Sequence, residues 1–344
     1  MRVLVTGHTG FKGSWLSLML MAKGHEVFGV ALDPDPESLF SKIDLGVLLK
    51  SDFRTDIRDF DAITQVVDRV RPDVVIHLAA QALVLDSYRS PFETFSINAQ
   101  GTVNLIQAIS SVAPEALLIA ITTDKVYRNV GKPGGYVEGD ELGASDPYSS
   151  SKVMADIALQ SWATSFPAKP RLSIVRAGNV IGPMDHSKDR LIPDILRATK
   201  SGELLAIRNP LATRPWQHVL DCLYGYVLLM EKMVNSDLSG IWNFGPLPTH
   251  EKRVQDVLDV AKKYASFEFQ AEKDENLIVK EHDLLTLDSS KAREQLDWSD
   301  KFTFEKAVGD SILVQREFEA LGTLAAQEHA ANYVTDYLNF VTLN

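Results

Sequence analysis

The chain has 344 residues, of which 45% are apolar and 24% are charged, and a chain of this size and composition is expected to bury a large core in two packed domains. Its formal net charge is -11 at pH 7, and no run of lysine or arginine is dense enough to follow a phosphate backbone, which argues against nucleic-acid binding as the main activity. The single cysteine, Cys222, excludes an intramolecular disulfide and a multi-cysteine metal site, and no metal site is predicted.

The first half of the chain alternates short β-branched runs with amphipathic helical stretches. Strands are expected at 2–7, 26–32, 73–80, 116–123 and 171–180, and helices at 13–24, 60–72, 97–112 and after Pro147. Such alternation requires βαβ crossovers, which align the strands in parallel and cover both faces of the sheet with helices. The sequence therefore predicts an α/β fold with a doubly wound parallel (Rossmann) sheet.

After about residue 180 the alternation gives way to a stretch rich in proline, arginine and aspartate. This change predicts a smaller lobe that closes over a ligand, while a helix at 218–234 and a strand at 240–246 return to the sheet. The expected division is a dinucleotide-binding domain at 1–178 plus about 212–245, and a second lobe at about 179–211 plus 246–344. The early apolar stretch is too short and interrupted to span a bilayer, so a cytoplasmic protein without a membrane segment is expected.

Three glycines, Gly7, Gly10 and Gly13, lie between the first expected strand and the first expected helix. Glycine suits a tight turn whose backbone N–H groups approach a pyrophosphate at a helix N-terminus. A carboxylate at the end of the second strand usually binds the adenosine ribose, and Asp33 is the nearest candidate. No arginine is adjacent to Asp33 in the sequence, which favours NAD over NADP. Asp56 and Ile57 follow the expected third strand, where they could contact the adenine or simply form a loop.

Tyr148 and Lys152 are four residues apart in a stretch where Pro147 favours the start of a helix, so the two side chains share one helix face. A phenol has a pKa of about 10 and is a poor base at neutral pH. A cation about 4 Å away at an effective dielectric near 20 stabilises the phenolate by about 4 kcal/mol, enough to lower the pKa by about three units. Lys152, helped by the positive ring of a bound nicotinamide, is therefore predicted to activate Tyr148.

These motifs, together with HLAAQ (77–81), NAQGT (98–102) and RAGNVIG (176–182), resemble those of the extended short-chain dehydrogenase/reductase family of nucleotide-sugar epimerases and dehydratases. The resemblance runs from residue 1 to about residue 310 and implies NAD as the cofactor. It implies that NAD is bound by Gly7, Thr9, Gly10, Phe11, Lys12, Gly13, Asp33, Asp56, Ile57, Leu78, Ala79, Ala80, Gln81, Asn98, Thr122, Tyr148 and Lys152.

Within that family, TTDKVY (122–127), DRLIPD (189–194) and IRNPLATRPWQHV (207–219) look most like the branch that dehydrates CDP-glucose. The implied substrate is a nucleotide sugar, with CDP-glucose favoured. The resemblance implies that Thr123 and Tyr148 bind the sugar O4, that Asp124 protonates the departing C6 hydroxyl, and that Lys125 acts at C5. Whether Lys125 is a base or a fixed cation stays open. The implied catalytic residues are thus Thr123, Asp124, Lys125, Tyr148 and Lys152.

The resemblance implies that the substrate is bound by Gln81, Thr123, Asn179, Arg190, Arg208 and Arg214. The three arginines suit a diphosphate because a guanidinium group can form two hydrogen bonds with a phosphate. Lys132 and Gly134 stand where the family usually has aromatic residues, so UDP- or GDP-linked sugars stay possible. A 4-epimerase and a non-catalytic dinucleotide sensor are the alternatives. A homodimer or a dimer of dimers is expected from the helices at 104–112 and 154–166, although their apolar residues could equally pack internally.

Overall fold

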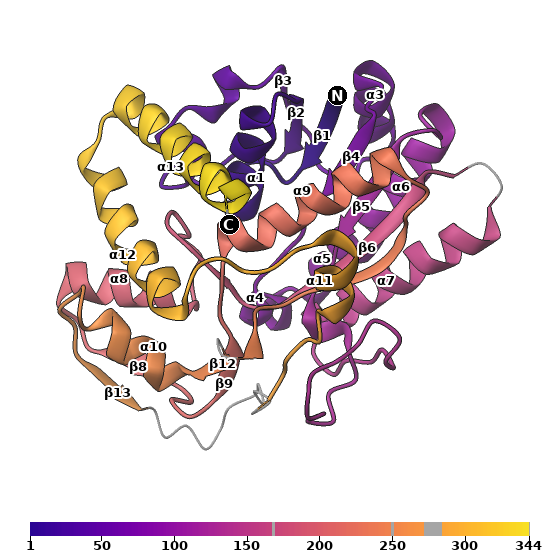
Figure 1. The fold of residues 1–344 in the computed structure, drawn as a ribbon. Helices are drawn as coiled ribbons and strands as arrows, with labels where there is room; N and C mark the ends of the chain where they lie inside the picture. The colour runs from indigo at the N-terminus through magenta and orange to yellow at the C-terminus, as the bar shows by residue number, and fades with distance from the viewer. Residues whose placement is uncertain (167–168, 249–250, 272–283, 344) are drawn as a thin grey trace.

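The computed structural model describes residues 1–166, 169–248, 251–271 and 284–343. Its centre is a parallel sheet of seven strands in the order β11-β6-β5-β4-β1-β2-β3 (Figure 1). The strands are β1 (Arg2–Thr6), β2 (Glu26–Ala31), β3 (Ser51–Arg54), β4 (Val74–His77), β5 (Leu117–Ile121), β6 (Arg171–Ala177) and β11 (Gly240–Phe244). The predicted doubly wound parallel sheet is confirmed.

Both faces of the sheet are covered because alternate side chains along each strand point to opposite faces. In β5, Leu117, Ile119 and Ile121 join one apolar cluster, whereas Leu118 and Ala120 join the other. The first cluster contains side chains from α1 (Phe11–Ala22), α9 (Val219–Asn235) and α13 (Thr323–Leu343). The second contains side chains from α3 (Phe60–Val70), α6 (Gly101–Val112) and α7 (Pro147–Ser165).

Short helices and turns connect the longer strands and helices around the large sheet. They are α2 (Leu39–Lys42), a 3-10 turn at Leu45–Leu48, α4 (Val84–Arg89), α5 (Pro91–Phe95), a π-helical turn at Ser96–Gln100 and a 3-10 turn at Asp124–Val126. The last turn directly follows β5 and carries the predicted catalytic pair.

A third apolar cluster lies outside the large sheet. It joins α8 (Leu191–Ser201), β8 (Leu205–Ile207), α10 (Val254–Ala261) and α12 (Phe304–Ala320). Short pairs complete this part: β8 with β13 (Phe269–Ala271), β9 (Thr213–Pro215) with β12 (Glu251–Arg253), and β7 (Val180–Ile181) with β10 (Gln217–His218). This third cluster comes mainly from the predicted second lobe, whereas α13, which that lobe was predicted to include, belongs to the first cluster. The division of the chain stays a prediction, and residues 249–250 and 272–283 of that lobe lie outside the described part.

The C-terminal tail forms the two helices α12 and α13, and α13 packs against α1 (Figure 1). Tyr333 of α13 contacts Trp15 of α1, with ring centroids 5.6 Å apart. The α11 helix (Ser290–Leu296) contributes Ala292 and Leu296 to the first apolar cluster, to which α1 and α13 belong. Within the described ranges we find no helix with the length and apolar character needed to cross a membrane.

Candidate active site

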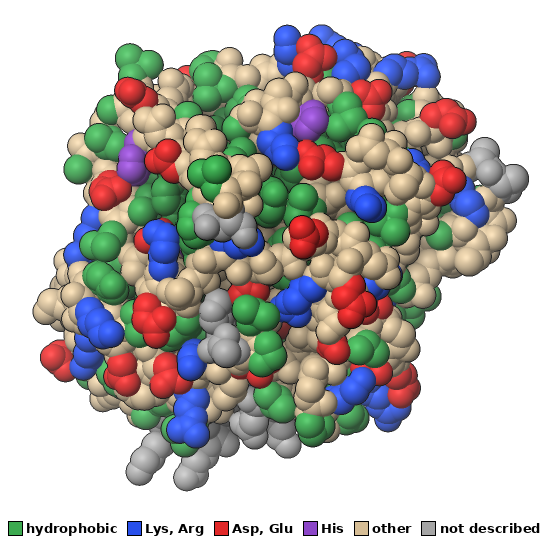
Figure 2. All heavy atoms as spheres, in the orientation of Figure 1, with side chains coloured by type: hydrophobic (Ala, Val, Ile, Leu, Met, Phe, Trp, Pro, Cys, Tyr) green, Lys and Arg blue, Asp and Glu red, His purple; other side chains and the backbone are tan. Residues whose placement is uncertain are grey.

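A cavity of about 1840 Å³ opens at the carboxyl ends of the parallel strands and extends between the sheet and α8. Residues that follow β1, β2, β3, β4, β5 and β6 line it, and α8 and β8 line its far end. Nearly all predicted site residues lie on its walls, whereas Asp33 and Asn98 do not. On the face of the molecule drawn in Figure 2, acidic, basic and apolar side chains are intermixed.

The glycine turn after β1 packs the backbone too closely for other residues. A Cβ on Gly13 would lie 2.2 Å from the carbonyl oxygen of Gly7, and Gly7 itself has a φ of 73°. The N-cap residue of α1, Gly10, provides no side-chain hydrogen bond to the first turn, which also contains no acidic residue. Gly10, Phe11, Lys12 and Gly13 all line the cavity, so the uncapped N–H groups and the Lys12 ammonium fit the pyrophosphate of a dinucleotide.

The structure corrects one part of the interpretation of the adenosine end. The guanidinium of Arg54 lies 3.8 Å from the carboxylate of Asp33, although no arginine neighbours Asp33 in the sequence. The register of β2 and β3 pairs Ala31 with Arg54, which brings the two strand ends together. Arg54 also forms an ion pair with Asp52, with 2.6 Å between Nη2 and Oδ2, and Nε2 of His8 lies 2.8 Å from Oδ1 of Asp52. The absence of an arginine beside Asp33 in the sequence therefore no longer argues for NAD. Asp33 itself lies outside the cavity lining, and 91% of its side chain is exposed.

The charge balance at Arg54 predicts a change of cofactor preference. Asp33→Ser removes one of the two carboxylates that neutralise Arg54 and leaves the guanidinium available to a 2'-phosphate. We expect the affinity for NADP to rise about tenfold relative to NAD, measured by isothermal titration. Asp35→Asn, which removes the same charge but keeps the oxygen that accepts from the Glu37 N–H, is the control and should not change the ratio. An unchanged ratio in Asp33→Ser would place the 2' position elsewhere.

The loop after β4 is held by a buried amide. Asn98 accepts from the Gln81 N–H at 2.8 Å and donates to the Gln81 carbonyl at 2.9 Å, so it supports the cavity wall from behind. The Gln81 side chain bonds to the backbone of Leu83 and to Thr94, while Leu78, Ala79 and Ala80 also line the cavity. Asn98 thus positions the loop, and the predicted direct contacts of Asn98 and Gln81 with a ligand stay predictions.

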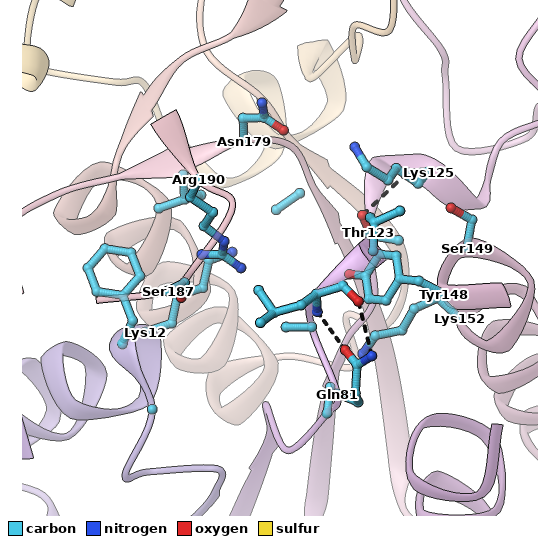
Figure 3. A pocket seen from close by; sticks show the side chains of 18 of the residues that line it. Lys12, Gln81, Thr123, Lys125, Tyr148, Ser149, Lys152, Asn179, Ser187 and Arg190 are labelled. Atoms are coloured by element: carbon cyan, nitrogen blue, oxygen red, sulfur yellow. Dashed lines mark hydrogen bonds between the residues drawn. The ribbon is translucent and has the colours of Figure 1, made fainter. Parts of the chain in front are cut away.

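The predicted catalytic residues converge on one wall of the cavity. Figure 3 shows Thr123, Tyr148 and Lys152 together, with Lys125 beside Thr123 and Arg190 on the opposite side. The side chains of Thr123, Tyr148 and Lys152 are buried, and Lys152 donates to the Ile121 carbonyl at 3.3 Å. The α7 helix begins as predicted at Pro147, where Asp146 accepts from the Ser149 N–H at 2.9 Å.

The turn after β5 places a carboxylate and an ammonium side by side. Thr123 donates to Oδ1 of Asp124 at 3.0 Å, and Thr123 Oγ1 accepts from the Lys125 N–H at 3.4 Å. Asp124 is 2% exposed, and its Oδ2 has no hydrogen-bond partner among the described residues. A buried oxygen without a partner is costly unless a ligand supplies one, so this atom is suited to a substrate hydroxyl. Lys125 lines the cavity, and Figure 3 shows its side chain pointing into it.

The lowered pKa predicted for Tyr148 depends on Lys152 together with a bound nicotinamide, and the protein alone does not reach it. Burial raises the pKa of Tyr148 to about 12, and the opposing influences come from Thr123 and Arg190. Burial also lowers the pKa of Lys152 to about 8, and the charge of Lys12 contributes to this shift. The sequence argument counted the attraction between the two groups but could not include the desolvation of both.

A buried ionic network behind the catalytic turn was missed by the sequence reasoning. Arg176 on β6 and Asp156 on α7 are 1% and 0% exposed and form an ion pair at 2.8 Å. Asp156 accepts from Thr122 at 3.3 Å, and Arg176 donates to Tyr127 at 2.9 Å. Thr122 and Tyr127 flank Thr123–Lys125, so the network fixes both ends of the catalytic turn.

Breaking this network is expected to destabilise the fold. Arg176→Met leaves Asp156 buried without its cation and should lower the free energy of unfolding by about 3–5 kcal/mol, measured by urea denaturation. Arg171→Met, at the start of the same strand with 31% of its side chain exposed, is the control and should cost less than about 1 kcal/mol. Equal losses in the two variants would contradict the role of the network.

The predicted substrate-binding residues from the second part of the chain also line the cavity. Asn179, Arg190, Arg208 and Arg214 face the same space as the catalytic wall. Arg190 is held by Asp185 at 3.1 Å. Lys132, by contrast, lies outside the cavity lining and pairs with Asp140 at 2.6 Å. In the described part of the chain, no group of three or more His, Cys, Asp or Glu side chains could hold a metal ion.

A doubly wound parallel sheet with an uncapped glycine turn and a Tyr–Lys pair at the same cavity defines a dinucleotide-dependent enzyme of the short-chain dehydrogenase/reductase type. The NAD dependent epimerase/dehydratase family matches residues 3–245, and the chain belongs to that family. NAD is therefore its cofactor.

Individual relatives agree with this assignment. The chain is 41% identical over 322 residues to CDP-glucose 4,6-dehydratase of Salmonella typhimurium, which covers 90% of this chain and 88% of the relative. The fold is similar to that of dTDP-glucose 4,6-dehydratase from Bacillus anthracis in complex with NAD, with a TM-score of 0.77, 21% identity and coverage of 93% and 97%. It is also similar to that of UDP-glucose 4-epimerase from Thermus thermophilus in complex with NAD, with a TM-score of 0.79, 24% identity and coverage of 93% and 99%.

Proposed function

We propose that this protein is a hydro-lyase that converts CDP-D-glucose to CDP-4-keto-6-deoxy-D-glucose and water, with NAD unchanged overall. The observation that carries the proposal is the meeting of Thr123, Tyr148 and Lys152 with Asp124 and Lys125 at one cavity wall. The likeness over 90% of the chain to a CDP-glucose 4,6-dehydratase supports the choice of reaction.

Each protein group has a defined task in this reaction. Tyr148 removes the proton from the sugar O4, and Thr123 holds that oxygen beside it. NAD, when held at the glycine turn after β1, would supply a positive ring charge and the hydride chemistry that links C4 oxidation to C6 reduction. The 4-ketone makes the C5 hydrogen acidic, and Lys125 removes that proton or stabilises the enolate that forms. Asp124 protonates the C6 hydroxyl, which leaves as water, and the proton at C5 is then restored.

The diphosphate is proposed to bind Asn179 and Arg214, with Arg190 and Arg208 nearer the nucleotide. An epimerase would use the Tyr–Lys pair but has no task for Asp124 and Lys125, so the catalytic turn favours dehydration.

For assembly we propose a homodimer through α7, where Met154 and Ile157 are 52% and 53% exposed. The product class fits a role in deoxysugar synthesis for surface polysaccharides.

One incubation tests the proposal. Purified protein with NAD and CDP-glucose should give a nucleotide sugar lighter by one water, with the absorbance in alkali that marks a 4-keto sugar. A product of unchanged mass but altered sugar would indicate an epimerase. Recovery of CDP-glucose alone would indicate a non-catalytic protein, and turnover of UDP- or GDP-glucose instead would move the proposal to another nucleotide.

A further inference from the structure

The far end of the cavity, which we call the slot, lies between α8 and β8 and has the chemistry of a nucleobase site. There the lining leaves the sheet and passes between the first turn of α8 and β8. Its apolar surface comes from Pro193, Ala206, Ile207, Trp216 and Val254. Apolar walls with a small number of placed polar groups are typical of sites that hold a nucleobase.

One carboxylate, that of Asp194, lies on this slot. It belongs to the first turn of α8, and 31% of its side chain is exposed. Its Oδ1 accepts from Nη2 of Arg197, one turn further along the helix. Among the described residues Oδ2 has no hydrogen-bond partner, so one acceptor stays available to a ligand. Burial raises the pKa of Asp194, while Arg197 opposes this shift.

The order of groups along the cavity places the base here. In the proposed function, Thr123 and Tyr148 hold the sugar, Asn179 and Arg214 bind the diphosphate, and Arg190 and Arg208 lie nearer the nucleotide; all of these residues line the cavity. A nucleotide sugar has its base at the end opposite the sugar, so the base reaches the slot between α8 and β8.

Cytosine differs from uracil and thymine at the group attached to C4. Cytosine carries an amine, which donates hydrogen bonds, whereas uracil and thymine carry a carbonyl oxygen, which accepts them. A carboxylate oxygen accepts from the amine and repels the carbonyl oxygen, so a single aspartate can both favour one base and reject the others.

We propose that Asp194 recognises the exocyclic amine of cytosine and thereby selects cytidine nucleotides over uridine and thymidine nucleotides. This inference rests on the proposed function only in the placement of the base at the slot. Arg197 holds Oδ1 and leaves Oδ2 to the amine.

The test compares the binding of CDP and UDP to the NAD-loaded protein by isothermal titration. Wild-type protein should bind CDP at least about tenfold more tightly than UDP. Asp194→Asn should abolish or reverse this preference, because Arg197 holds the amide oxygen and the amide NH2 that faces the base donates to the uracil carbonyl but not to the cytosine amine. Asp259→Asn is the matched control, since Asp259 lies on α10 outside the cavity lining and asparagine keeps the oxygen that accepts from Gln255. That control should leave the ratio unchanged, and a thermal melt of each variant checks its folding.

Three results would overturn the proposal: equal binding of CDP and UDP to the wild type, an unchanged ratio in Asp194→Asn, or an equal shift in Asp259→Asn. These outcomes are separate from the failure of the proposed function. A protein that selects CDP through Asp194 but forms no 4-keto sugar retains this inference and loses the reaction. A protein that dehydrates CDP-glucose with an unchanged ratio in Asp194→Asn loses this inference alone.

Discussion

Tyr148→Phe is expected to lower the rate of C4 oxidation by about a thousandfold, because it removes the group that takes the O4 proton while the ring still fills its buried place. The measurement is a single turnover with excess enzyme, followed as reduced cofactor. Tyr224→Phe, which makes the same change on α9, is the control and should retain the wild-type rate. Undiminished oxidation in Tyr148→Phe would remove the basis of the proposed mechanism.

The size of the pKa shift explains why Tyr148 needs more than one positive charge. Lowering the pKa of Tyr148 from about 12 to 7 requires about 7 kcal/mol of selective stabilisation of the phenolate. One cation at about 4 Å supplies about 4 kcal/mol at an effective dielectric of 20. Lys152 alone is therefore insufficient, and the positive nicotinamide ring is the second charge that the proposed complex provides.

The titrations of Tyr148 and Lys152 together predict a bell-shaped dependence of the oxidation rate on pH. A base acts in its deprotonated form, so the rate rises as pH increases through the pKa of Tyr148. The pKa of Lys152, about 8 in the protein alone, marks where its supporting charge is lost, so the rate falls again at higher pH. In Tyr148→Phe the rising limb should disappear.

Local sequence signals were enough to predict the sheet, the glycine turn and the proximity of Tyr148 and Lys152, whereas Thr123, Asp124 and Lys125 were named from the family resemblance. Gly7, Gly10 and Gly13, like Tyr148 and Lys152, are close in the sequence, and their spacing determines which side chains share a turn or a helix face. Both motifs reach the same cavity in the structure.

The features that sequence reasoning missed depend on contacts between distant segments. Arg54 meets Asp33 only because β2 and β3 pair in one particular register. Asp156 and Arg176 are 20 residues apart and come from a helix and a strand. The burial that raises the pKa of Tyr148 likewise depends on several segments, so the spacing of Tyr148 and Lys152 could predict their proximity but not the net shift.

Lys125→Met is expected to stop the reaction after C4 oxidation. The substitution keeps the length of the side chain but removes the ammonium that acts at C5, so the C5 proton should no longer exchange with solvent. We expect reduced cofactor to form at close to the wild-type rate, while exchange of C5 hydrogen with D₂O falls by about a hundredfold or more. Mass spectrometry of the recovered nucleotide sugar measures the exchange.

A matched lysine and a conservative variant complete this experiment. Lys132→Met removes a lysine that pairs with Asp140 outside the cavity, and it should leave both C4 oxidation and C5 exchange unchanged. If oxidation and exchange both continue at wild-type rates in Lys125→Met, Lys125 has neither of its proposed roles.

Lys125→Arg then separates the two roles that the sequence left open. Arginine retains a positive charge at neutral pH but cannot release its proton, because its pKa is above about 12. A base must lose its proton, whereas a fixed cation only needs its charge. Loss of C5 exchange in Lys125→Arg therefore assigns Lys125 as the base. Retained exchange assigns it as the cation that stabilises the enolate, and a different base must then take the C5 proton.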